Sequence, residues 1–146
     1  MRRFAFPLES ALRIRKIQAD VENAKLARLE SERTDCRRQL DLLPFEGRKR
    51  PEAIRAMQSM ERDELVEIDT LAVFLKSEKK RLTAREGELL HLITSARRFV
   101  QQATQRVELL ETLKKDVLRK WQVEVDQELQ TLAEESHMHQ LQSRRE

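Results

Sequence analysis

The strongest constraint on this chain is an apolar repeat between residues 89 and 121, in which the positions alternate between steps of four and three. Nine of its ten positions are apolar. They are Leu89, Ile93, Ala96, Val100, Ala103, Val107, Leu110, Lys114, Val117 and Trp121. A spacing of about 3.5 residues keeps one stripe of a helix facing the same neighbour, which is typical of a supercoiled helix pair. We call this stripe the second seam.

A similar stripe, the first seam, begins at Leu8 and is apolar at eight of eleven positions. They are Leu8, Leu12, Arg15, Ala19, Glu22, Leu26, Leu29, Arg33, Cys36, Leu40 and Leu43. The three charged members would lower stability while fixing register and partner choice. Pro7 suits a first helical turn, where its missing N–H costs nothing. The pattern predicts a first helical arm over residues 8–43.

A break is predicted after this arm, because Pro44, Gly47 and Pro51 lie within eight residues and do not favour a continuous helix. Pro51 and Glu52 then suit a new helix start. We therefore expect a single coiled-coil domain over 1–146, with arms at 8–43 and 65–140, a break and tip at 44–64, and a frayed tail at 141–146.

The second arm extends the seam in both directions. Upstream, the alternating steps run through Leu71, Leu75, Glu78, Leu82 and Arg85. A four-four step around Leu89 then predicts a stutter, which locally unwinds a supercoil. Downstream, the stripe continues at Val125, Leu129 and Leu132.

Composition also favours long helices over a globular core, because only 39% of residues are hydrophobic, 38% are charged, and glycine occurs twice. The predicted fold is all-α, a long antiparallel two-helix coiled coil with a tip or short helix after the proline-rich break. Such a coil offers no water-excluding concavity. The sequence therefore predicts a non-enzymatic protein without cofactors.

The two arms differ in length, at about 54 Å and about 100 Å for a rise of about 1.5 Å per residue. Either residues 52 to 64 fold back to lengthen the first arm, or the end of the second arm offers its apolar stripe to a partner. Charge favours the first option. The basic residues near the start are Arg13, Arg15 and Lys16, and the acidic residues near the end are Glu124, Asp126, Glu128, Glu134 and Glu135.

Several isolated features favour structural interpretations. Cys36 lies on a seam, without a second cysteine for a disulfide, which favours the cytosol. His137 and His139 are two apart and so face different sides of a helix, which disfavours a metal site. The net charge of +3 is small, and the cluster 48–50 is interpreted as a solvated turn, so no nucleic acid is expected. Neither a signal peptide nor an apolar spanning run is recognised, so any membrane contact would be peripheral.

Three stretches of the sequence resemble the FliJ family of flagellar type III export proteins. They are the opening FAFPLESALRIRKIQADVENAKLARLESE, the middle IDTLAVFLKSEKKRL and the tail LLETLKKDVLRKWQVEVDQELQTLAEESH. The opening is similar in its two aromatics, Phe4 and Phe6, followed by Leu8, Leu12 and Arg15. The middle stretch carries Ile68, Leu71, Phe74 and Leu75. The likeness covers nearly the whole chain, although the early double-proline break departs from the family.

This resemblance implies an antiparallel coiled coil like the central stalk of rotary ATP synthases. It further implies a protein without ATPase activity that binds the hexameric export ATPase, the cytoplasmic domain of the export gate, and chaperones of flagellar subunits. Its location would be the cytoplasm, peripheral at the cytoplasmic face of the cell membrane. The residues expected to bind partners are those named in the opening and middle stretches together with Trp121, which is otherwise interpreted as part of the seam.

Three other functions remain open from sequence. One is the equivalent stalk of a virulence injectisome, which neighbouring genes would distinguish. Another is a generic structural coiled coil that forms parallel dimers, which sedimentation would detect. The third is a nucleic-acid-binding helix pair, which would require steeply salt-dependent DNA binding.

Overall fold

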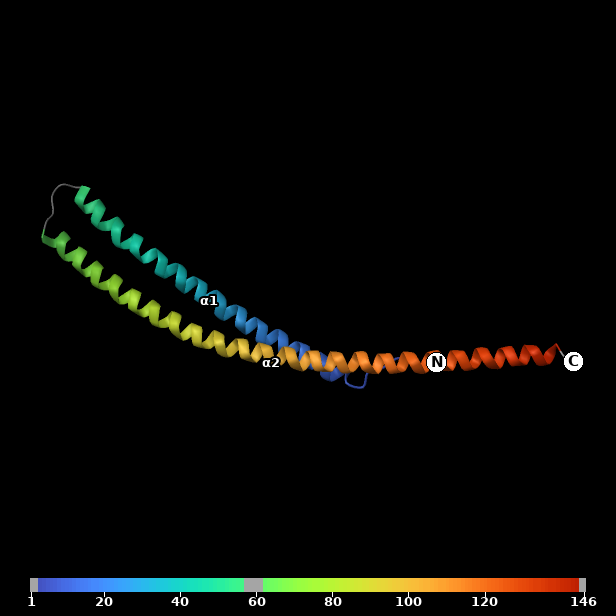
Figure 1. Cartoon of the computed structure of the whole chain (residues 1–146). Coiled ribbons are helices and arrows are strands. Elements are labelled where there is room, and N and C mark those ends of the chain that lie inside the picture. The colour runs from blue at the N-terminus through green and yellow to red at the C-terminus, as the bar shows by residue number, and fades with distance from the viewer. Residues whose placement is uncertain (1–2, 57–61, 145–146) are drawn as a thin grey trace. The chain divides into compact units, whose positions relative to one another are not determined.

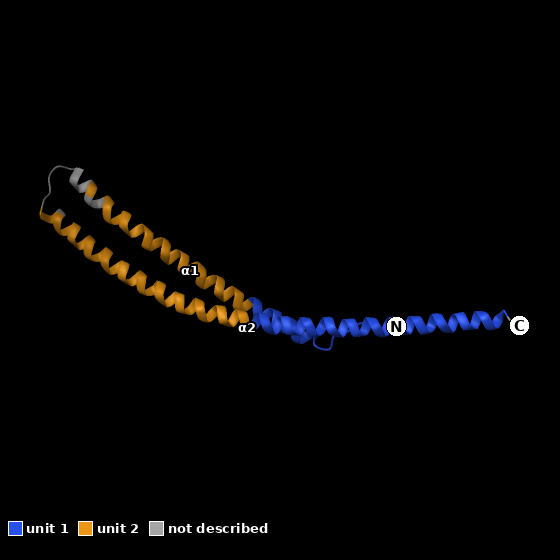
Figure 2. Cartoon of the chain, in the orientation of Figure 1, with its two compact units in different colours: residues 1–20, 102–146 blue, residues 21–101 orange. Residues whose placement is uncertain are grey.

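A computed structural model describes residues 3–56 and 62–144, and the elements in these ranges are two α-helices. Helix α1 spans Glu9–Ala56 and helix α2 spans Arg62–Ser143 (Figure 1). Their residues group into two compact units (Figure 2). Unit 1 comprises residues 1–20 and 102–146, and unit 2 comprises residues 21–101. Each unit is described by itself.

In unit 2, α1 and α2 pack against each other in opposite directions. Contacts join Glu30 to Arg97, Cys36 to Leu82 and Gly47 to Leu75, so residue numbers fall on one helix as they rise on the other. The core consists of the buried residues Cys36, Leu82 and Leu89, with Leu29, Leu40 and Leu43 packed around them. These are residues of the two seams, which confirms that the seams mark the packed faces.

In unit 1, the start of α1 runs against α2 in the same antiparallel sense. Lys16 pairs with Glu111, Glu9 pairs with Lys114, and Phe4 lies against Trp121. The buried side chains contributed by the start of the chain are Phe6, Leu12 and Ala19. Both units therefore consist of two packed helical segments, as the predicted all-α class requires.

Burial follows the predicted seams closely. All ten positions of the second seam are buried or half-buried, and so are ten of the eleven positions of the first. The exception is Leu8, which is 44% exposed and precedes α1 in a turn. The stutter occurs one heptad, about two turns, earlier than predicted, because Arg85 is exposed and Glu86 takes the inner position. Steps of four, four and three thus lead from Glu78 through Leu82 and Glu86 to Leu89.

The predicted end of the first helix at residue 43 is wrong. Helix α1 continues through Pro44, Gly47 and Pro51 to Ala56. A proline inside a helix costs about 3 kcal/mol and a glycine about 1 kcal/mol. Beyond Pro44 the helix still lies against α2, where Gly47 is half-buried. A Cβ added at Gly47 would lie 3.1 Å from Leu75 Cδ1, so the glycine also permits a close helix approach.

The predicted tip at 44–64 is therefore helical over 44–56 and 62–64, while 57–61 lies outside the described residues. The predicted frayed tail is also helical as far as Ser143. Among the residues that the structure describes, neither helix contains an apolar stretch suited to crossing a bilayer.

The predicted charge pairing of the two chain ends is wrong as well. Lys16 pairs with Glu111, and Arg15 donates to Gln18 on its own helix. The reason is the register of the two helices. Helix α1 begins at Glu9, which lies opposite Lys114, so α1 does not reach the part of α2 that holds the acidic stretch from Glu124 onward. Helix α2 continues alone to Ser143, and every described residue from 126 onward is exposed (Figure 2).

Candidate partner-binding surfaces

The chain start is held by an aromatic contact in unit 1. The rings of Phe4 and Trp121 lie with centroids 5.7 Å apart and planes tilted by 58°. The carbonyl of Phe6 accepts the Glu9 N–H at 3.2 Å, and the carbonyl of Leu8 accepts the Leu12 N–H at 2.9 Å. These bonds begin α1 directly after the aromatic opening. Phe4 and Trp121 are half-buried against each other, so both belong to a packed contact.

Two ion pairs fix the helix register in unit 1. Lys114 Nζ lies 2.7 Å from Glu9 Oε2, and Lys16 Nζ lies 3.2 Å from Glu111 Oε1. The hydrogen bond from Lys114 lowers the pKa of Glu9 below its ordinary value. These side chains are substantially exposed, so solvent screening keeps the contribution of each pair to stability small. Their main consequence is to specify which turns of the two segments face each other.

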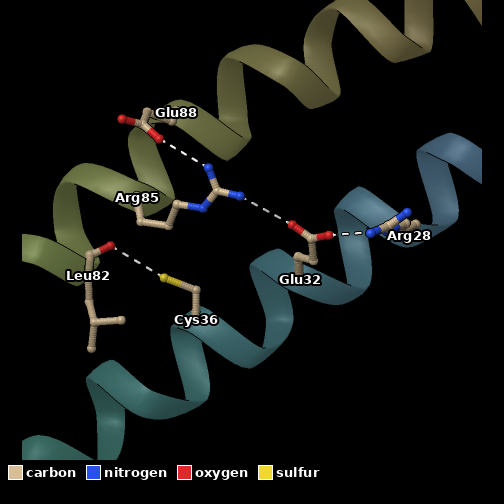
Figure 3. A network of polar contacts seen from close by, with 6 residues as sticks. All are labelled: Arg28, Glu32, Cys36, Leu82, Arg85 and Glu88. Carbon is tan, nitrogen blue, oxygen red and sulfur yellow. Dashed lines mark hydrogen bonds and ion pairs between the residues drawn. The ribbon is translucent and has the colours of Figure 1, made fainter.

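Unit 2 contains a denser polar network beside its core (Figure 3). The Glu32 carboxylate lies between Arg28 of its own helix, at 3.4 Å, and Arg85 of α2, at 3.3 Å. Arg85 also donates to Glu88 at 3.1 Å. Next to this network, the Cys36 thiol donates to the Leu82 carbonyl at 3.3 Å. The thiol is thus buried within the core, in agreement with the structural interpretation of Cys36.

A second set of ion pairs explains why Glu86 occupies an inner position. Its carboxylate lies 3.9 Å from Arg33 Nε and 3.6 Å from Arg37 Nη1, and its side chain is only 15% exposed. Arg33 is one of the charged positions of the first seam. The seam charge is therefore matched by an opposite charge from α2, which fixes register as predicted for polar seam residues.

The ten predicted partner-binding residues fall into two groups. In unit 1 are Phe4, Phe6, Leu8, Leu12, Arg15 and Trp121, of which Leu8 alone is exposed. In unit 2 are Ile68, Leu71, Phe74 and Leu75, of which Phe74 alone is exposed, at 59%. The remaining eight are buried or half-buried. Seven of these eight are apolar, and packing explains their apolar character, so Leu8 and Phe74 are the members of the set whose side chains lie mostly at the surface.

The end of α2 is a long surface that α1 does not cover. Residues 122–143 hold five acidic residues and neither lysine nor arginine, and we call them the acidic segment. Its exposed apolar side chains are Val123, Leu129, Leu132, Met138 and Leu141. The unequal arm lengths indicated such a stripe as one of two options. In the structure α1 is longer than predicted, and the end of α2 is nevertheless uncovered, so each of the two options describes part of the molecule.

Among the described residues, no group of histidine, cysteine and acidic side chains is arranged to hold a metal ion, and no polar side chain is buried. His137 and His139 are both exposed. Comparison of the chain with protein family models, with curated proteins and with solved structures finds no match.

Proposed function

We propose that this chain is an antiparallel coiled-coil stalk of the flagellar type III export apparatus, which binds the hexameric export ATPase and links it to the export gate and to subunit chaperones. The fold and the surfaces support this proposal physically, and the sequence resemblance supplies the identity of the partners. Heptad seams with one stutter are the pattern of a supercoiled pair whose strands locally unwind. The protein itself performs no chemistry.

The observation that carries the proposal is the acidic segment. A helix that continues beyond its intramolecular partner, with Val123, Leu129 and Leu132 exposed along it, can insert into a cavity of another protein. Burying this stripe would drive binding at about 25 cal/mol per Å², less the cost of association. Exposed Phe74 in unit 2 offers a separate contact for the gate or a chaperone.

The experiment adds the chain to purified flagellar export ATPase at micromolar concentrations and measures ring assembly and ATP hydrolysis. We expect stimulation of both. The variant Leu129→Gln/Leu132→Gln should lose most of the stimulation, because it removes the exposed apolar stripe. A matched control is Leu90→Gln/Leu92→Gln, which alters two exposed leucines of unit 2 and should stimulate normally.

Absence of any effect of the wild-type chain would overturn the proposal. Equal loss of stimulation in both double variants would instead contradict the role of the acidic segment. Gate binding is tested separately with the gate's cytoplasmic domain and Phe74→Ala, which should weaken binding about tenfold if Phe74 anchors this contact.

A further inference from the structure

Unit 1 carries two surfaces of opposite charge. The acidic segment has five acidic and no basic residues, a net charge of −5. Residues 3–20 and 102–121 together have nine lysines and arginines and five acidic residues, a net charge of +4. The second set is called the basic part of unit 1. Because opposite charges attract over about 10 Å at moderate salt, the two surfaces are complementary.

Both surfaces also expose apolar side chains. On the basic part, Ile14 is 55% exposed, Leu109 is 65% exposed and Leu113 is 42% exposed. On the acidic segment, Leu129 and Leu132 are exposed. Contact between the surfaces would thus bury apolar area in addition to pairing charges, which is the usual composition of a stable interface.

A single chain cannot join its own two surfaces. The acidic segment and the stretch 102–121 lie along one continuous helix, because α2 runs unbroken from Arg62 to Ser143, and residues 3–20 pack beside that stretch. The acidic segment directly follows the basic stretch 102–121 on this helix and would have to break it to fold back. The complement of each surface must therefore come from another molecule, and a second copy of the chain carries both complements.

We infer that two copies of this chain associate through unit 1, with the acidic segment of each copy on the basic part of the other. If the two α2 helices lie antiparallel and meet near Trp121, both contacts form at once, and the pair closes with two-fold symmetry. Glu124 then lies near Lys120 of the other copy, because residues 120, 124 and 128 are four apart and share one face of the helix. A parallel pair would instead place the two acidic segments together, where like charges repel.

This inference does not rest on the proposed function, because it is tested on the isolated protein. Sedimentation equilibrium of the full chain at micromolar to tens of micromolar concentrations should give twice the monomer mass of 17.3 kDa. Raising NaCl to about 0.5 M should weaken the dimer at least tenfold, since interfacial charges are then largely screened. The variant Glu124→Lys/Glu128→Lys should sediment as a monomer at the same concentrations.

Two further variants make the test specific. Adding Lys120→Glu to the first variant restores an opposite charge across the interface and should tighten the dimer at least tenfold relative to the first variant. The matched control is Glu46→Lys/Asp69→Lys, which changes the net charge equally through exposed residues of unit 2 and should leave the dimer intact.

A wild-type chain that remains monomeric at these concentrations would overturn the inference. A dimer that resists salt and the reversal at Glu124 and Glu128 would overturn it too, because that is the behaviour of a parallel apolar coil. Circular dichroism of each variant at the working concentration verifies that the helices are retained.

Discussion

Two parts of helix α2 carry the same kind of apolar stripe with opposite outcomes. Over 89–121 the residues of the second seam are buried or half-buried, and Leu89 is only 1% exposed. Over 122–143 the stripe continues, but Leu132 is 60% exposed. The difference is the presence of α1, which has 48 residues against 82 in α2. A heptad pattern thus identifies a face suited to packing, whereas the length and register of the second helix decide whether that face is covered.

The comparison also separates two sources of helix stability. The covered part is stabilised by packing of its apolar face, the usual source for helices in proteins. The acidic segment depends on its own helix formers and on local contacts such as the bond from Gln130 Nε2 to Glu134 Oε1, at 3.0 Å. We expect it to open more readily, as regions with few buried contacts do.

The largest expected effect comes from truncating matched leucines in the two parts. Leu89→Ala should lower the free energy of unfolding by about 3 kcal/mol, because it leaves a cavity in the unit 2 core. In a chain kept monomeric by Glu124→Lys/Glu128→Lys, Leu132→Ala should change it by less than about 0.5 kcal/mol, because the side chain is exposed in the monomer. Urea denaturation followed by circular dichroism measures both. Equal losses would show that the acidic segment is packed within the monomer.

A smaller effect distinguishes the contribution of helix propensity to stability from that of packing, in the part of the molecule where α1 and α2 pack together. A Cβ added at Gly87 meets no atom within 4 Å, so Gly87→Ala should raise the free energy of unfolding by about 1 kcal/mol through helix propensity. The matched change Gly47→Ala should gain less, since its Cβ would crowd Leu75. A larger gain at Gly47, in the same denaturation experiment, would contradict the close approach of α1 and α2 in unit 2.

The smallest effect concerns the charged contact of the chain start. The pKa of Glu9 lies below its ordinary value of 4.5, because the folded state provides a hydrogen bond from Lys114. The stabilisation is therefore present above the unfolded-state pKa and is lost as pH falls through the lower folded-state pKa. In an NMR titration, Lys114→Met should raise the pKa of Glu9 toward its ordinary value. Lys120→Met is the control, and an equal shift there would contradict a specific contact.

Much of the fold could be predicted from sequence, because seam positions depend on side-chain periodicity alone. The continuation of α1 through Pro44 could not, because the cost of that residue is a local quantity, whereas the packing of Gly47 against Leu75 of α2 beyond it is tertiary. The inner position of Glu86 depended in the same way on two arginines of the other helix.

The partner-binding residues were predicted less well. An aromatic opening is unusual in a charged helix and attracts a functional interpretation, yet Phe4 and Phe6 are used to hold the chain start in unit 1. The unequal arm lengths indicated that the end of the second helix could remain uncovered, as the acidic segment does. How much of α2 is covered by α1 depends on the register of the two helices, which the ion pairs of Glu9 and Lys16 specify.

The most direct test of the central claim is a pair of distances within unit 1. Spin labels are introduced at Ala5 and Gln122, or at Ala5 and Gln142, in a Cys36→Ala chain diluted with unlabelled protein. We predict that the distance from Ala5 to Gln122 is the shorter one, and that the distance to Gln142 is longer by about 30 Å, the length of twenty helical residues. A distance to Gln142 equal to or shorter than that to Gln122 would contradict the account, because the chain start would then cover the acidic segment.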